Sequence, residues 1–172
     1  ANVKPVLQAM PMLEMFYPYT LVSLTRFGKW DEILKEPKPD PSLKITTSFW
    51  HYARGSAYAA SKQTAKAEAE LTALRAVNKT LGEARLFNNA ATDVMKIAEF
   101  ALEGRIALSR GDKEAGFDLL NKAIAAEDST SYAEPADWDM PIREVLGSAL
   151  LASGDAAGAE KVFRAEILRR PR

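Results

Sequence analysis

Apolar residues recur three or four residues apart along most of this chain, which is the period of a helix with one buried face. The clearest run follows Pro141, and its apolar positions are Ile142, Val145, Leu146, Ala149 and Leu150. Runs that alternate apolar and polar residues with β-branched enrichment, as strands do, are absent from the sequence. The pattern therefore predicts an all-α protein of about eight helices.

Turn and cap residues divide the periodic segments into pairs of helices. Gly111 and Gly154 each follow an apolar run, and the next residues, Asp112 and Asp155, favour the N-cap of a second helix. Asp139 is expected to cap the first helix of the last pair. The predicted pairs cover residues 45–77, 92–126 and 139–170, and a shorter, partial pair covers residues 12–36.

Prolines modify the N-terminal part of the pattern. Pro18 lies inside a first helix expected from Met12 to Phe27, and we expect it to kink that helix or to shift its start. Three prolines between residues 37 and 41 predict an extended connector before the next helix.

Small and large residues recur at matching places in these pairs. In the last pair, Gly147 and Ala159 are small, Leu150 and Phe163 are large, and Pro171 closes the segment. Antiparallel helices approach closely only where one presents Gly or Ala and a large neighbour fills the space. The earlier pairs repeat the pattern with Gly55, Tyr58, Ala67, Leu71 and Leu74, and then with Gly104, Ala107, Gly111, Gly116, Leu120 and Ala123. In these positions the sequence resembles the tetratricopeptide repeat family, in its bacterial form.

The resemblance implies a fold and a function. It implies one helical-repeat domain over residues 1–172, built as a right-handed superhelix of antiparallel helix pairs, and a non-enzymatic scaffold that binds a protein or peptide. In this family the first helix of each pair lines a concave groove, which here gives Phe49, Tyr52, Ser56, Arg105, Leu108, Ser109, Glu144 and Ser148. Arg105 is the expected specificity contact, because a guanidinium can hold a carboxylate in two parallel bonds. The alternative is that Arg105 and Glu144 only pair with each other.

The sequence also departs from the family pattern. The intervals between matching glycines exceed the family repeat of about 34 residues, so the connectors carry insertions. Arg54 and Glu103 stand where the family usually has leucine, so either the helices rotate or the two charges find partners. The resemblance further implies that the chain is part of a longer repeat protein. Partly uncovered apolar residues such as Val162 or Ile167 then predict weak self-association through the C-terminal edge.

Composition and charge narrow the function classes. Hydrophobic residues make up 47% and charged residues 27% of the chain, as in soluble globular proteins. A formal net charge of zero argues against nucleic-acid binding, which needs a basic surface. The absence of cysteine excludes disulfides and thiolate chemistry, and leaves cytoplasm and periplasm equally open. No apolar run approaches the roughly 18 residues of a membrane span.

Candidates for catalysis or metal binding are few. His51 is the only histidine, and a zinc site needs several nitrogen or sulfur ligands, so no metal or cofactor is predicted. No phosphate-binding glycine loop or nucleophile elbow is present, which argues against an enzyme. Glu99 and Glu103 share one helical face, where carboxylates are more often solvated than catalytic. We expect His51 to pack between helices.

The connector before the last pair allows two interpretations. In the structural one, Tyr132 and Trp138 cover the bundle edge, while Glu134 pairs with an arginine such as Arg143. In the functional one, these residues form a secondary pocket for a small ligand or a peptide terminus. The alternative to a scaffold is accordingly a small-molecule or metal-binding sensor or regulatory domain that uses His51 or residues 138–143.

Overall fold

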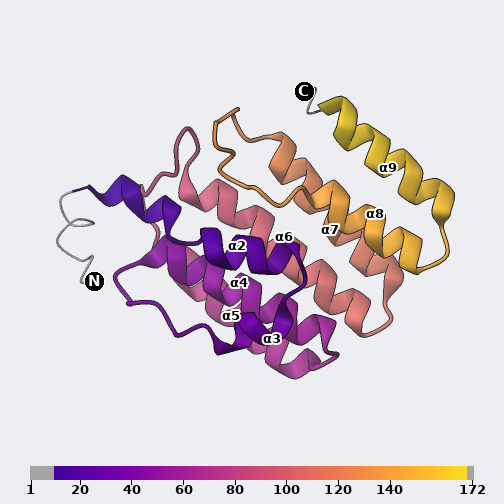
Figure 1. Cartoon of the computed structure of the whole chain (residues 1–172), viewed down its shortest axis with the longest axis horizontal. Coiled ribbons are helices and arrows are strands. Elements are labelled where there is room, and N and C mark those ends of the chain that lie inside the picture. The colour runs from indigo at the N-terminus through magenta and orange to yellow at the C-terminus, as the bar shows by residue number, and fades with distance from the viewer. Residues whose placement is uncertain (1–9, 170–172) are drawn as a thin grey trace.

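Eight α-helices and one short 3₁₀ helix follow one another through residues 10–169, the part of the chain that the computed structural model describes (Figure 1). In chain order they are η1 (Pro11–Phe16), α2 (Tyr19–Arg26), α3 (Trp30–Lys35), α4 (Lys44–Ala60), α5 (Thr64–Asn78), α6 (Ala91–Ser109), α7 (Lys113–Asp128), α8 (Ile142–Ala152) and α9 (Ala156–Arg169). Within this range there is no strand, only one isolated bridge between Arg85 and Ala90. The predictions of an all-α fold and about eight helices are confirmed.

The helices form successive pairs that lie side by side (Figure 1). Short turns join α4 to α5, α6 to α7, and α8 to α9, and the members of each pair pack on each other. α6 also packs on both helices of the preceding pair, and α7 packs on α8, so the pairs follow one another in space as in the chain. Their bounds agree closely with the predicted ranges 45–77, 92–126 and 139–170.

The N-terminal part differs from the single helix predicted between Met12 and Phe27. Pro18 breaks the helix completely and stands at the N-cap of α2, while the residues before it form η1. The break follows from the missing N–H of proline and from the clash of its ring with the preceding turn. α2 and α3 then pack on each other and on α4, where Leu21 and Ile33 are buried together with Trp50.

Glycines mark the closest approaches between helices, as the small-and-large pattern predicts. A Cβ atom added to Gly55 would lie 2.6 Å from Leu102, and one added to Gly116 would lie 2.6 Å from Leu108. Heavy atoms in contact normally stay about 3.5–4.0 Å apart. A larger residue at either position would force the facing leucine side chain to shift or the two helices to separate.

Arg54 and Glu103, the two charges that depart from the predicted repeat pattern, both have partners. Arg54 donates from Nε to Glu70 at 2.9 Å and lies over the Trp50 ring, 4.5 Å from its centroid. Glu103 accepts a hydrogen bond from Arg75 at 2.6 Å. The alternative in which the charges find partners is therefore the correct one.

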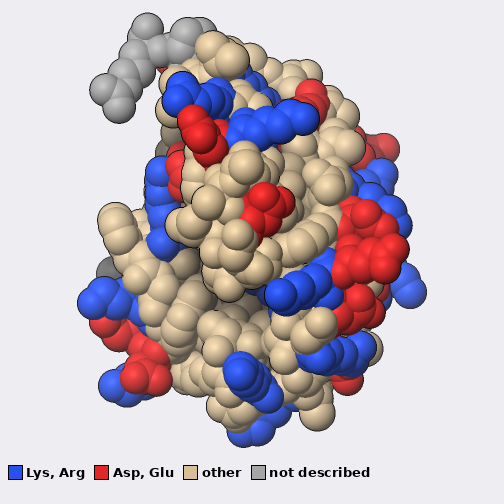
Figure 2. Space-filling model, turned by 90° about the vertical axis from the view of Figure 1, so that its right-hand side faces the viewer, with Lys and Arg blue, Asp and Glu red and all other residues tan. Residues whose placement is uncertain are grey.

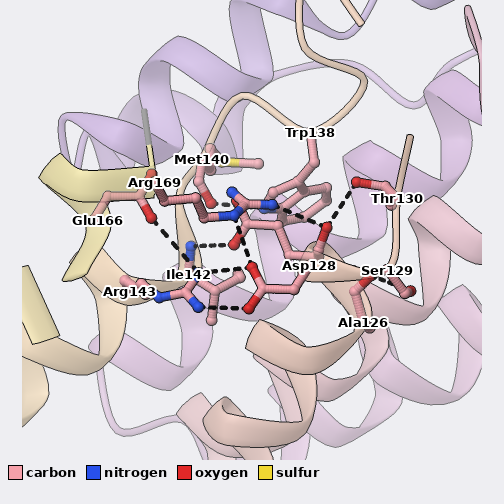
Figure 3. A network of polar contacts seen from close by, with 11 residues as sticks. Ala126, Asp128, Ser129, Thr130, Trp138, Met140, Ile142, Arg143, Glu166 and Arg169 are labelled. Atoms are coloured by element: carbon pink, nitrogen blue, oxygen red, sulfur yellow. Dashed lines mark hydrogen bonds and ion pairs between the residues drawn. The ribbon is translucent and has the colours of Figure 1, made fainter. Parts of the chain in front are cut away.

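A network of charged side chains ties α7 to α8 and α9 (Figure 3). Arg143 donates two hydrogen bonds to the carboxylate of Asp128, with Nη1 2.8 Å from Oδ1. Arg169 also lies against Asp128, with its Nε 2.7 Å from the same oxygen. Glu166 approaches Arg143 at 3.8 Å from the side of α9. The last pair is thus held to the preceding one by charged hydrogen bonds as well as by apolar packing.

The beginning of α8 is capped by a residue that the sequence did not suggest. The carboxylate of Glu127, which is only 2% exposed, accepts the backbone N–H of Ile142 at 3.0 Å. Pro141 occupies the N-cap position, so the cap predicted for Asp139 is wrong. The predicted caps at Asp112 and Asp155 are confirmed, because their carboxylates accept backbone N–H groups three residues further on.

Candidate functional site

A hollow of about 380 Å³ opens between the end of α2 with the α2–α3 turn, the last turns of α6, and α8. We call it the α2–α6–α8 hollow. The residues on which its chemistry depends are Arg26, Trp30, Arg105, Leu108, Glu144 and Ser148. Apolar and aromatic side chains form most of its wall and a few charged groups enter it, as in typical ligand sites.

Local sequence explains how these side chains meet. Gly28, with φ of +63°, turns the chain sharply between α2 and α3, and the turn leads directly into Trp30. Arg105 and Leu108 are one turn apart on α6 and therefore share one face. Pro141 starts α8 so that Glu144 and Ser148, four residues apart, also share a face. Residues from three separate helix pairs therefore surround one space.

The structure divides the predicted groove residues into two groups. Arg105, Leu108, Glu144 and Ser148 line the hollow. Three others are buried in the core, and they are Phe49 (4% exposed), Tyr52 (0%) and Ser56 (0%). Ser109 is not among the residues that line the hollow, and its hydroxyl donates to the Ile106 carbonyl at 2.8 Å. Phe49 and Tyr52, the two aromatic residues expected in the groove wall, are therefore not accessible to a partner.

Trp138 explains why that wall is closed. Its ring stacks on Phe49 at 5.7 Å and meets Tyr52 edge-on at 5.2 Å between centroids. Its indole N–H donates to the carbonyl oxygen of Met140 at 2.6 Å. The connector between α7 and α8 thus packs against α4 and covers the first part of the face that was expected to line the groove. Trp138 acts as a core residue, as the structural interpretation predicts.

Of the two arginines that line the hollow, only one forms an ion pair with a described residue. Arg26 lies 3.5 Å from Glu144, with both side chains almost half exposed, so this ion pair is weak. Among residues 10–169, Arg105 has no hydrogen bond or ion pair, although its Nε atom is buried. The predicted alternative, an ion pair between Arg105 and Glu144, is therefore wrong. Leaving a buried guanidinium nitrogen without a partner costs free energy.

Sequence reasoning missed the contribution of the N-terminal pair to this site. Arg26 and Trp30 line the hollow, but they lie outside the three full helix pairs that the sequence predicts and carry no local motif. Arg26 of α2 and Glu144 of α8 are separated by 118 residues in the chain. No periodic signal within one helix could indicate that contact, because it depends on how all the pairs stack.

The residues of the predicted secondary pocket do not meet in one place. His51 is buried between helices, with Nδ1 2.6 Å from Glu70, as its structural interpretation predicts. Tyr132 is 77% exposed and its hydroxyl donates to Glu134. Arg143 binds Asp128 rather than Glu134, so the predicted pair between Glu134 and Arg143 is wrong.

Two carboxyl groups beside these residues have pKa values below their usual range. Burial raises the pKa of Glu70, but hydrogen bonds from His51 and Arg54 outweigh it and leave the pKa below its usual value. A hydrogen bond from Arg143 lowers the pKa of Asp128, and burial offsets the effect only partly. Both carboxylates therefore stay ionised and serve as fixed partners of basic side chains, not as proton donors or acceptors at neutral pH.

No group of three or more histidine, cysteine or carboxylate side chains within residues 10–169 is arranged to hold a metal ion. None of the helices in that range is both long and apolar enough to cross a lipid bilayer.

The surface seen from the side of α9 is mixed in charge (Figure 2). Basic and acidic side chains alternate around a less charged central area that is hollowed, and no continuous basic band crosses this face. Comparisons with family models, with curated proteins and with solved structures find no match to this chain.

Proposed function

We propose that this chain is a helical-repeat interaction module of the tetratricopeptide type, and that a peptide segment of a partner protein binds in the α2–α6–α8 hollow. One observation carries the proposal, the unpartnered guanidinium of Arg105 in a hollow with largely apolar walls. An arginine in such a setting gives a ligand both a charged anchor and a desolvated surface, which is the usual composition of binding hot spots. The role is binding, without catalysis.

The packing of the helices supports the same proposal. Pairs that follow one another in space, with glycines at their closest approaches, are what repeat proteins use to present a continuous binding face. The hollow takes side chains from the first, third and fourth pairs, so a ligand in it would contact several repeats at once. A formal net charge of zero gives no general attraction for nucleic acid.

A steric block tests the proposal directly. Ser148 is exposed on α8 and lines the hollow, so Ser148→Trp would fill it without removing a core contact. Thr72→Trp on α5 is the matched control, because Thr72 is also an exposed hydroxyl residue whose side chain donates to the carbonyl four residues earlier. Labelled protein is applied to an array of random octapeptides, some with free carboxyl ends and some amidated.

We expect the parent and Thr72→Trp to bind the same subset of octapeptides, and Ser148→Trp to lose at least tenfold in affinity for them. Melting temperatures of the three proteins show whether each variant is folded. Peptides that bind Ser148→Trp as well as the parent would place the site elsewhere, and an array without any bound peptide would contradict the proposed function.

A further inference from the structure

The wall that α8 gives to the hollow is held in place by two helices that do not line it. Among the described helices, α8 packs on α7 and α9, and neither of these contributes a residue to the lining. Across the hollow, α8 meets α2 through the half-exposed pair of Glu144 and Arg26, which is weak. The position of this wall, and with it the width of the hollow, therefore depends on how α8 sits on α7 and α9.

One buried carboxylate joins the start of α8 to the end of α9. Glu127 stands in the last turn of α7, and one of its oxygens accepts the backbone N–H of Ile142, the first residue of α8, at 3.0 Å. Its other oxygen lies 3.2 Å from Nη1 of Arg169, the last residue of α9. The same side chain thus caps one helix and holds the C-terminal turn of another.

Arg169 uses all three of its guanidinium nitrogens at this junction. Besides the contact with the Glu127 side chain, Nη2 donates to the Glu127 backbone carbonyl at 3.1 Å, and Nε lies 2.7 Å from Asp128. Asp128 in turn holds Arg143 of α8 (Figure 3). Because the guanidinium is a rigid planar fork, it fixes the two carboxylates relative to each other, which a lysine cannot do.

The end of α9 is therefore an element with two states, docked and open. Helix ends open more easily than the core of a protein does. When the last turn of α9 opens, Glu127 and Asp128 each lose a charged partner, and a carboxylate as deeply buried as Glu127 is destabilised by that loss. The bond from Glu127 to Ile142, which fixes the start of α8, is weakened as a consequence.

We infer that Arg169 is a positioning residue for the α2–α6–α8 hollow, and that docking of the last turn of α9 regulates binding there by fixing the α8 wall. This inference rests on the proposed peptide-binding function and adds how that site is controlled. The coupling is reciprocal: a peptide that fits the hollow favours the docked state of α9, and opening of α9 weakens the peptide.

Amide hydrogen exchange of the free protein tests the first half of the inference. Arg169→Gln should speed exchange at residues 142–146 at least tenfold, and Arg169→Lys should fall between this variant and the parent. Arg164→Gln is the control, because it removes only an exposed ion pair on the same helix and should exchange like the parent. Exchange at residues 142–146 that is the same in Arg169→Gln and in the parent would overturn the inference.

The octapeptides that bind on the array test the regulatory half. They should slow exchange at residues 166–169 of the parent, although none of these residues lines the hollow. The last turn of α5, residues 75–78, should be unaffected and is the control. Arg169→Gln should bind the peptides about three- to tenfold more weakly, where tenfold corresponds to a correctly shaped hollow in about one molecule in ten.

A purely structural role of Arg169 would not produce this reciprocal effect. Peptides that bind the parent but leave exchange at residues 166–169 unchanged, or that bind Arg169→Gln as tightly as the parent, would overturn the inference and leave the proposed function in place. If no octapeptide binds, the proposed function fails and the regulation inferred for it fails too, while exchange in the free variants still decides whether Arg169 holds the α8 wall.

Discussion

Phe163 of α9 occupies the space that a side-chain carbon at position 147 would need. A Cβ added to Gly147 would lie 2.5 Å from the ring, far inside the contact distance of about 3.5–4.0 Å. The sequence pairs these two residues as small and large, and the structure shows them facing each other across α8 and α9. At this scale, sequence and structure therefore agree on which residues set the spacing within a pair.

The first prediction concerns this contact. Gly147→Leu should lower the free energy of unfolding by about 1–3 kcal/mol or more, because the helices must separate to accept the side chain. Helix propensity works in the opposite direction, since leucine favours a helix more than glycine does, so a net loss reports the clash. Urea unfolding measures the change, with Ser148→Ala as a neutral neighbour.

A double substitution tests the cause of that loss. Phe163→Ala removes the ring, so Gly147→Leu should cost much less in a Phe163→Ala background than in the parent. If the losses in unfolding free energy from the two substitutions simply add, then position 147 and the Phe163 ring are not in direct steric contact.

Tyr52 behaves differently from its sequence interpretation. It was expected to line the groove, but it is 0% exposed and packs edge-on against Trp138. The repeat position could not indicate that a connector from residues 129–141 would fold over Tyr52, because such a connector has no periodic pattern.

The second prediction corrects the role of Tyr52. Tyr52→Ala should lower the free energy of unfolding by about 3–5 kcal/mol, as truncation of a buried aromatic residue usually does. Arg105→Gln, by contrast, should leave the melting temperature nearly unchanged, because the parent guanidinium makes no hydrogen bond or ion pair within residues 10–169. Thermal unfolding of both variants, monitored by circular dichroism, shows whether Tyr52 acts in the core or on the surface. A Tyr52→Ala protein that melts like the parent would return Tyr52 to the binding face.

Among the secondary-structure elements, the long periodic helices could be predicted and the irregular segments could not. Bounds of α4 to α7 follow from apolar spacing and from turn residues, which act within a few residues of the chain. η1 and the α7–α8 connector depend on contacts with distant elements. Asp137 of the connector, for example, accepts the backbone N–H of Phe87 at 2.9 Å and the side-chain amide of Asn89 at 2.6 Å.

The third prediction concerns the network that joins α7 to α8 and α9. The pKa of Asp128 is lowered by the hydrogen bond from Arg143, with burial opposing and the charges of Arg143 and Arg169 adding to the effect. A carboxyl group whose pKa is lower in the folded than in the unfolded chain stabilises the folded state. This contribution is fully present when the pH is above the unfolded-state pKa of about 3.9, and it is lost as the pH falls through the lower folded-state pKa.

Arg143→Gln should therefore be less stable than the parent at pH 5, and the difference should narrow as pH falls from about 4 toward 2. Urea unfolding at pH 5, 4 and 3 measures the difference. Arg164→Gln on the exposed side of α9 is the control and should follow the parent at every pH. A difference that stays constant with pH would show that Asp128 does not depend on Arg143.

In the whole molecule, the candidate site combines predicted and unpredicted parts. The sequence predicted four of its residues from their positions on the first helices of the pairs, because these positions recur from one pair to the next. These residues are Arg105, Leu108, Glu144 and Ser148. The sequence did not predict that Arg26 lies in the site or that it pairs with Glu144. The contact between α2 and α8 depends on how all the helix pairs between them stack. Prediction from sequence is limited to short-range contacts, because sequence patterns indicate only which residues are neighbours within one or two helices.

The fourth prediction concerns the outer face of the last helix. Ile167 is 70% and Leu168 is 80% exposed on α9, and Leu151 of α8, which is 56% exposed, lines the same shallow depression as Ile167. Exposed apolar surface of this kind promotes association, so we expect weak, concentration-dependent dimers of this chain in sedimentation velocity. Ile167→Glu should abolish them. Parent protein that stays monomeric at millimolar concentration would contradict the prediction.

The central claim is that a peptide binds in the α2–α6–α8 hollow. The most direct measurement is a set of amide NMR spectra of the ¹⁵N-labelled chain, recorded with and without the octapeptide that binds most tightly on the array. The account predicts that the largest shift changes cluster at residues 26–30, 105–109 and 144–149. Changes concentrated on α5, on α7 or on the exposed face of α9, with these three segments unaffected, would contradict it.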